Sequence, residues 1–211
     1  GLTEASPVVS LNPYIGINKG GSIGLPIKGV EVEIVNDIGK ILNIGEVGEI
    51  IVKGLNVMQG YFNNSAATAE TIKNGWLYTG DLGRKDQDGY LYIMGRKKDM
   101  VNVRGLNVYP REIEDVLCQH PKIKESAVIG VEDYHKGEVP KGFVVLREGA
   151  AATERELILY LRQHLANYKV PRNIEFRNIL PKNTTGKVLK RVLIEEEHKK
   201  TLENYEPQAA S

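Results

Sequence analysis

Cysteine is nearly absent from this chain, whose 211 residues include only Cys118. A single cysteine excludes a framework of intrachain disulfides and is typical of a reducing compartment, so we expect Cys118 to pack on a helix. Histidine is also scarce: the four histidines stand far apart, without a second ligand at metal-site spacing. We therefore expect neither a disulfide-stabilised secreted domain nor a histidine-based metal centre.

Long apolar runs and an excess of one charge are missing as well. No apolar segment approaches the ~20 residues of a membrane span and no secretory signal opens the chain, so we expect a cytoplasmic protein without a transmembrane segment. The 28 basic and 27 acidic residues give a net charge of +1, which provides no general field for nucleic acid or an anionic membrane. Any anion-binding site must therefore be local.

The patterning that is present predicts two regions of different character. Apolar and polar residues alternate over 30–35 and again over 49–53, with glycines between them, which predicts antiparallel strands joined by tight turns. From Asp99 onward, helix and strand signals alternate and predict a small α/β domain. Its helices are expected to begin at Pro110, after a Thr153 cap and at Val188, and its strands to run over 125–131, 141–146 and 173–179.

Residues 95–114 hold the most unusual combination of residue types. Basic side chains, two glycines and a proline interrupt a run whose apolar positions would otherwise read as a strand. Glycines allow close backbone approach and basic side chains favour anionic groups, so the stretch predicts a phosphate-bearing ligand. A solvated hairpin with scattered charge is the alternative.

Further motifs flank this stretch in a fixed order. Tyr78-Thr79-Gly80-Asp81 stands upstream and Pro181-Lys182-Asn183-Thr184-Thr185-Gly186-Lys187 stands downstream. The ordered set resembles the adenylate-forming superfamily of acyl-CoA synthetases, aryl-CoA ligases, luciferases and peptide-synthetase adenylation domains, over residues 1–191. Residues 107–114, NVYPREIE, look most like the fatty acyl-CoA synthetase branch. The resemblance implies an α+β fold, with an antiparallel, β-rich, distorted barrel-like segment followed by a small mobile α/β domain.

The resemblance also implies a division of the chain and a nucleotide site. Residues 1–97 would be the C-terminal end of the large AMP-binding domain, and residues 98–211 the small mobile domain, with Lys98 as the hinge. Asp81 would accept hydrogen bonds from the ribose hydroxyls of ATP, and Arg96 would share the ribose with it. Thr3 would contact the α-phosphate and Glu4 would hold Mg²⁺, unless this terminus is disordered. The loop over 54–61 resembles one that packs beside the nucleotide, although a glycine-bounded connection fits it equally well.

Gly186-Lys187 invites comparison with a nucleoside-triphosphate P-loop, but that pattern requires glycine at 181 and Ser or Thr at 188. The chain has Pro181 and Val188 there, which excludes it. By resemblance, Lys187 instead bridges the acyl carboxylate and the ATP phosphate during catalysis. The resemblance implies a reaction in two steps, in which the acid first reacts with ATP to give an acyl-adenylate and coenzyme A then displaces AMP. The loop over 103–107 would serve the second step. Gly105 would leave room for the pantetheine arm, beside Leu106, where family members often have an aromatic residue.

The function implied for the full enzyme is ATP-dependent ligation of a small-molecule carboxylic acid, a fatty acid by branch, to coenzyme A. The chain begins with Gly1 and has no counterpart of the phosphate loop or acyl pocket. We therefore expect a fragment or the small subunit of a split enzyme, inactive without the missing N-terminal AMP-binding domain or large subunit. The alternatives are an adenylation domain that loads a carrier protein and a non-catalytic docking module.

Overall fold

The chain forms two compact units, Gly1–Lys98 and Asp99–Ser211, in a computed structural model that describes residues 1–133 and 137–205. The division falls after Lys98, and the assignment of the second unit as a mobile domain stays a prediction. Within the described residues, no helix combines the length and the apolar character that crossing a membrane requires.

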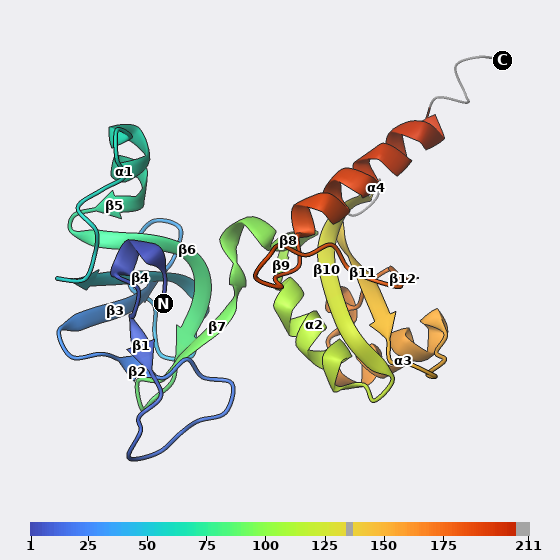
Figure 1. Cartoon of the computed structure of the whole chain (residues 1–211), viewed down its shortest axis with the longest axis horizontal. Helices are drawn as coiled ribbons and strands as arrows, with labels where there is room; N and C mark the ends of the chain where they lie inside the picture. The colour runs from blue at the N-terminus through green and yellow to red at the C-terminus, as the bar shows by residue number, and fades with distance from the viewer. Residues whose placement is uncertain (134–136, 206–211) are drawn as a thin grey trace. The chain divides into compact units, whose positions relative to one another are not determined.

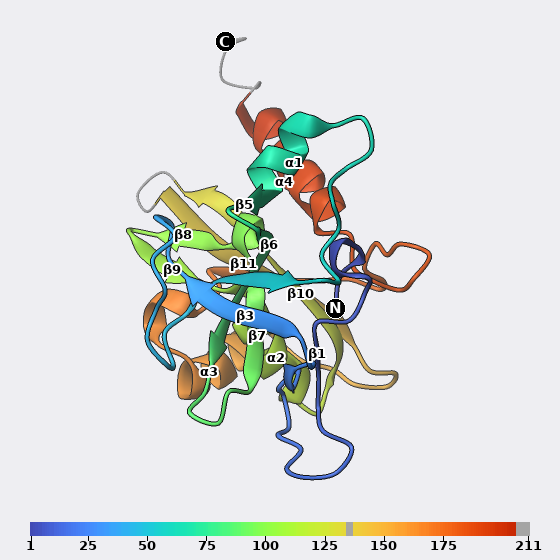
Figure 2. The ribbon, with the colours of Figure 1, turned by 90° about the vertical axis from the view of Figure 1, so that its left-hand side faces the viewer.

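The first unit is built on an antiparallel sheet with the strand order β3-β4-β6-β5, to which β7 adds by pairing with β6. Helix α1 lies beside β5 and β6, as Figure 2 shows. The short pair β1 and β2 precedes the sheet. The elements are η1 Thr3–Ala5, β1 Ser10–Leu11, β2 Leu25–Pro26, β3 Val30–Val35, β4 Gly48–Gly54, α1 Ser65–Thr71, β5 Ile72–Lys73, β6 Trp76–Lys85 and β7 Leu91–Arg96.

Burial in β3 and β4 corrects part of the alternating pattern predicted from the sequence. Strand β3 keeps one face turned to the core through Val32 and Ile34. Strand β4, however, is buried over residues 48–52 without alternation, and this run includes Glu49, which is 9% exposed. A carboxylate is therefore enclosed where the pattern predicted a solvent-facing position.

The second unit is an α+β domain around a sheet of order β10-β11-β8-β9, with β12 added parallel to β11. All other pairings in this sheet are antiparallel. Figure 1 shows the unit from β8 onward. Its elements are β8 Val101–Val103, β9 Leu106–Val108, α2 Pro110–Gln119, β10 Ile123–Asp133, β11 Gly137–Leu146, α3 Glu154–His164, η3 Asn167–Lys169, β12 Asn173–Phe176 and α4 Lys190–Tyr205, and η2 Lys97–Asp99 links the two units.

Helices cover both faces of the β10–β11 hairpin. Val128 and Val144 belong to the core that α2 and α3 complete, whereas Ile129, Phe143 and Val145 belong to the core that α4 completes. Neighbouring residues along a strand point to opposite faces, so apolar side chains at successive positions need a cover on each side. This two-layer burial gives the domain its helices on both sides of one sheet.

Local signals place two of these helices where the sequence predicts them. Pro110 is the first residue of α2, a position that does not need a backbone N–H, and the Thr153 hydroxyl accepts a hydrogen bond from Glu156 N at 3.2 Å to cap α3. Cys118 was expected to pack. It is instead exposed on α2, with Sγ 3.3 Å from the Ser126 hydroxyl.

A group of ion pairs joins α4 to β11 and β12. Lys141 Nζ lies 3.0 Å from Glu175 and 2.6 Å from Glu197, and Lys200 Nζ contacts the same two carboxylates at 2.9 and 2.8 Å. Burial alone would raise the pKa of Glu175, but hydrogen bonds from Lys200 and Lys141 and the charge of Arg177 lower the pKa to about 2. The charged network therefore favours the folded unit most when Glu175 is ionised.

We expect Glu175→Gln to lower the free energy of unfolding by about 1 to 3 kcal/mol at pH 7. Because the folded pKa is depressed, this stabilisation is complete above the ordinary value of 4.5 and is lost as the pH falls towards about 2. Urea unfolding at pH 7 and pH 3 should show the difference between the two proteins shrink. The exposed carboxylate Glu148, changed to Gln, is the matched control; an equal effect there would contradict the network.

Candidate functional site

Asp81 sits on an irregularity in β6. Strand β4 pairs with β6 through Glu49 opposite Leu82 and Ile51 opposite Tyr78, so that β6 carries additional residues between these two pairs. Gly80 adopts a φ of +69°, which glycine accepts at little cost. Such bulges interrupt the ladder and re-aim side chains, and they are common beside functional sites.

Thr79 holds the bulge together. Its hydroxyl donates to Ile50 O at 2.7 Å and accepts from Asp81 N at 3.1 Å. The side chain thereby replaces backbone partners that the irregular register has removed. The Thr-Gly-Asp order is thus explained locally: threonine supplies the bonds, glycine the conformation, and aspartate the projecting carboxylate.

Asp81 and Arg96 are brought together by direct cross-strand pairing of β6 and β7. Arg96 Nε lies 3.0 Å from Asp81 Oδ1, and the side chains are 56% and 25% exposed. A carboxylate beside a guanidinium offers acceptors for hydroxyl groups and donors for anionic oxygens. The family resemblance assigned both side chains to the ribose of ATP, and that assignment stays a prediction.

Glu49 and Lys97, for which the sequence predicted no role, are bonded to each other, and they adjoin the segments that carry this pair. Glu49 Oε1 accepts a hydrogen bond from Gly80 N at 3.1 Å, and Lys97 Nζ lies 3.1 Å from Glu49 Oε2 and 2.8 Å from the exposed Asp37. The hydrogen bond with Asp37 and that with Glu49 raise the pKa of Lys97, against an opposing effect of burial. The one signal for Glu49 was a glutamate opening an apolar strand.

The predicted hinge residue Lys98 lies in the middle of η2, directly after Lys97, and is exposed. Upstream, Gly95 has a φ of +155° at the end of β7. The stretch from 95 to 99 therefore contains a glycine with positive φ followed by one short 3₁₀ turn. These features describe the link between the two units and leave the hinge role of Lys98 a prediction.

Thr3 and Glu4 lie in η1, which is tied to the loop over 54–61. Met58 N donates to Glu4 O at 2.8 Å, and the Tyr61 hydroxyl donates to Glu4 Oε1 at 2.9 Å. This hydrogen bond to Glu4, together with burial, raises the pKa of Tyr61. The loop that was predicted either to pack near a nucleotide or to be a plain connection thus orients the Glu4 carboxylate.

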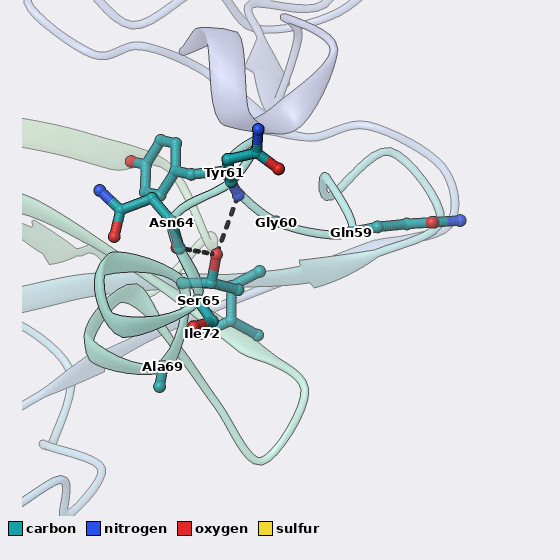
Figure 3. A pocket seen from close by; sticks show the side chains of 9 residues that line it. Gln59, Gly60, Tyr61, Asn64, Ser65, Ala69 and Ile72 are labelled. Carbon is teal, nitrogen blue, oxygen red and sulfur yellow. Dashed lines mark hydrogen bonds between the residues drawn. The ribbon is translucent and has the colours of Figure 1, made fainter.

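A hollow of about 640 Å³ opens next to Tyr61 (Figure 3). Thr68 Oγ1 accepts from Tyr61 N and donates to Asn64 O, both at 2.9 Å, and these bonds fix its wall. Gln59, Gly60 and Tyr61 in its lining belong to the loop over 54–61, but none of the side chains predicted to contact ATP, Mg²⁺ or coenzyme A lines it. Its lining is uncharged and consists of Gln59, Gly60, Tyr61, Asn63, Asn64, Ser65, Thr68, Ala69 and Ile72.

Gly105 and Leu106 lie in the second unit, at the turn between β8 and β9. Arg104 and Gly105 have φ values of +53° and +85°, and Gly105 N donates to Asn102 Oδ1 at 2.7 Å. Two central residues with positive φ are the requirement of a type I′ hairpin. An added Cβ at Gly105 would meet nothing within 4 Å, so the backbone conformation alone explains this glycine, and Leu106 beside it is 49% exposed.

Lys187 is exposed on a tight turn that Asn183 organises. Asn183 Oδ1 accepts hydrogen bonds from Thr185 N at 3.0 Å, the Thr185 hydroxyl at 2.8 Å and Lys187 N at 2.9 Å. The backbone closes the turn through Asn183 N and Lys187 O at 2.9 Å. A rigid turn therefore presents the lysine to solvent.

Ion pairs anchor this turn on both sides. Lys182 Nζ lies 2.7 Å from Glu125 on β10, and Lys190 Nζ lies 2.7 Å from Glu114 on α2. Among the described residues, no carboxylate forms an ion pair with Lys187 itself. The local scaffold neutralises the flanking lysines and leaves the charge of Lys187 available to an anion.

The described residues contain no group of three or more His, Cys, Asp or Glu side chains that could by themselves hold a metal ion. Magnesium at a nucleotide site does not need such a cluster, because one or two carboxylates and the phosphates of the substrate hold it. Glu4, fixed by Tyr61, fits that donor set.

Two protein families match the chain: AMP-binding enzyme over residues 1–62, and AMP-binding enzyme C-terminal domain over residues 112–187. The long-chain-fatty-acid–CoA ligases of Escherichia coli and Bacillus subtilis are each 48% identical to it, over 196 and 198 residues. These alignments cover 93% of this chain and 35% of each ligase, so the chain spans about a third of the length of these curated relatives.

Solved structures agree across both units. ATP-bound MatB from Rhodopseudomonas palustris is 39% identical with a TM-score of 0.87, over 91% of this chain and 39% of that chain. The o-succinylbenzoate CoA synthetase of Bacillus subtilis, in complex with the acyl-adenylate intermediate OSB-AMP, is 40% identical with a TM-score of 0.84, over 92% and 40%. The chain therefore belongs to the AMP-binding enzyme family, in which it corresponds to the C-terminal portion of an acyl-CoA ligase.

Proposed function

We propose that the chain carries the ribose-binding end and the mobile domain of an ATP-dependent carboxylic acid–CoA ligase whose acid is a fatty acid. The observation that carries this proposal is the 48% identity to long-chain-fatty-acid–CoA ligases over 93% of the chain. The side chains that the proposed chemistry requires, Asp81, Arg96, Lys187, Thr3 and Glu4, are present in the chain. Because the relatives are longer chains, the complete reaction belongs to the protein that includes the remaining part.

In the first step, the acid carboxylate attacks the α-phosphate of ATP, which forms an acyl-adenylate and releases pyrophosphate. Asp81 accepts hydrogen bonds from the ribose hydroxyls, and the adjacent Arg96 supports the same sugar. Lys187, whose charge no described carboxylate neutralises, stabilises the negative charge that builds between acid and phosphate. Thr3 would contact the α-phosphate, and Glu4 would offer a carboxylate oxygen to Mg²⁺, which would neutralise part of the phosphate charge.

In the second step, the thiolate of coenzyme A attacks the acyl carbon and AMP leaves. The turn at Arg104 and Gly105, stabilised by Asn102, presents the backbone of β8 and β9 to the pantetheine arm. Since Lys187 and Gly105 serve different steps, rotation of the second unit about Lys98 brings each to the reaction centre in turn.

Lys187→Ala tests the first step. In the complete ligase we expect adenylate formation to slow by about 100-fold or more, the cost of losing one electrostatic contact in a transition state. Thioester formation from pre-made acyl-adenylate should be largely spared. Rapid-quench measurement of both half-reactions checks this, with exposed Lys124→Ala on β10 as the matched control. Equal loss in the two half-reactions would refute the assignment of Lys187 to one step.

Lys98→Pro tests the hinge. Proline fixes φ near −65° and removes the amide donor, so η2 loses part of its conformational range. We expect the thioester half-reaction to slow more than adenylate formation, measured with the same two assays. If both half-reaction rates of Lys98→Pro stay within about twofold of those of the unmodified enzyme, the pivot lies at another residue.

The isolated chain provides the third test. Ligand pockets normally bury about 70–90% of a small molecule, and most of the enclosing surface belongs to the part of the relatives that this chain does not match. We expect the purified 211-residue chain to form no acyl-CoA and to bind ATP with Mg²⁺ no more tightly than about millimolar. Isothermal titration calorimetry measures this, and micromolar binding would show that the nucleotide site is misplaced.

A further inference from the structure

Glu49 is a buried carboxylate to which the two-step chemistry assigns no role. Its side chain is 11% exposed, and it is the second residue of the buried stretch 48–52 of β4 in the first unit. Charged side chains are seldom buried without partners, because a carboxylate loses its hydration on leaving water. The identity of its partners therefore indicates why the residue is there.

The first partner is the bulge that carries Asp81. Gly80 N would lack a ladder partner in this irregular register, and Glu49 Oε1 accepts its hydrogen at 3.1 Å. A hydrogen bond to an ionised acceptor is stronger than one to a neutral acceptor. Without it, the amide next to Asp81 would lose its partner and the bulge would lose one of its bonds.

The second partner is the last residue before the predicted hinge. Lys97 Nζ lies 3.1 Å from Glu49 Oε2, so the two oxygens of one carboxylate hold two separate segments. Lys97 also pairs with Asp37, whose side chain is 88% exposed. The Asp37 contact is the shorter of the two and has the larger effect on the pKa of Lys97, but it joins Lys97 to a side chain that solvent surrounds. Exposed ion pairs contribute little to stability, so we expect the enclosed partner Glu49 to provide most of the anchoring.

We infer that Glu49 is a positioning residue that fixes the Asp81 bulge and, through Lys97, anchors the start of the link between the two units to the first unit. The inference rests on the proposed function in so far as Asp81 binds ribose and the second unit rotates. Its consequence is that Lys97 stays with the nucleotide site, and that backbone rotation begins at Lys98. One buried carboxylate thus gives the ribose contact and the pivot a common support.

Four variants of the full 211-residue chain separate the two contacts. Glu49→Ala removes both. Glu49→Gln keeps an oxygen for Gly80 N but replaces the oxygen that holds Lys97 with an amide that cannot accept. Lys97→Met breaks the same tie from the other side, and Asp37→Asn removes only the exposed partner.

Two measurements on uniformly ¹⁵N-labelled protein read out the contacts: hydrogen exchange of the Gly80 amide, and the relaxation order parameter of the Lys98 amide. We expect Glu49→Ala to speed Gly80 exchange by about tenfold or more, as loss of one ordinary hydrogen bond implies, and to lower the order of Lys98. Glu49→Gln and Lys97→Met should lower the order of Lys98 while Gly80 exchange stays within about threefold of the unmodified chain. Asp37→Asn should change neither.

Three results would overturn the inference: unchanged Gly80 exchange in Glu49→Ala, equal loss of order at Lys98 in Asp37→Asn and Lys97→Met, or Gly80 exchange in Lys97→Met as fast as in Glu49→Ala. The last would indicate general loosening instead of two separate contacts. Should Glu49→Ala fail to fold, the Glu49→Gln and Lys97→Met pair still decides the anchoring. Asp81→Ala in the complete ligase tests the proposed function independently, since unchanged affinity for AMP in that variant would count against the ribose role of Asp81 and leave the two contacts of Glu49 unaffected.

Discussion

Apolar side chains on both faces of the β10–β11 hairpin are the constraint that shapes the second unit. A fully buried aromatic or aliphatic side chain such as Phe143 contributes about 1.5–3 kcal/mol, and this is gained only if each face is covered. Helices α2 and α3 cover one face, so the chain has to continue past β12 and bring α4 to the other. The turn that presents Lys187 is the connection made necessary by this route.

In the first unit, the candidate ribose-binding residues lie on irregular strands and not on a turn. Asp81 and Arg96 lie where the ladder between β4, β6 and β7 is irregular, and not in the hollow beside Tyr61. A regular strand would direct a residue to one face or the other. The bulge frees Asp81 from that alternation, and the cost in backbone hydrogen bonds is offset by Thr79 and Glu49.

Features with a local cause could be predicted from the sequence. Pro110 and Thr153 mark helix starts through the chemistry of the first turn, and the motifs around Asp81 and Lys187 led to the family that the comparisons support. Features that arise from tertiary burial could not. In the sequence, Glu49 has the pattern of a solvent-facing position in an alternating strand. Only the folded sheet shows that β4 is buried on both faces there. Gly105 has a local reason of a different kind: its positive φ in the turn between β8 and β9 is sufficient to require glycine, and its role beside the pantetheine arm stays a prediction.

Asn183 has a consequence for the electrostatics of Lys187. An aspartate in its place would accept the same three hydrogen bonds and close the same turn, but it would put a full negative charge next to the lysine. The amide builds the turn without a counter-ion. Asn183 therefore meets two requirements at once: it gives the loop its shape, and it leaves the positive charge of Lys187 without a neighbouring negative charge.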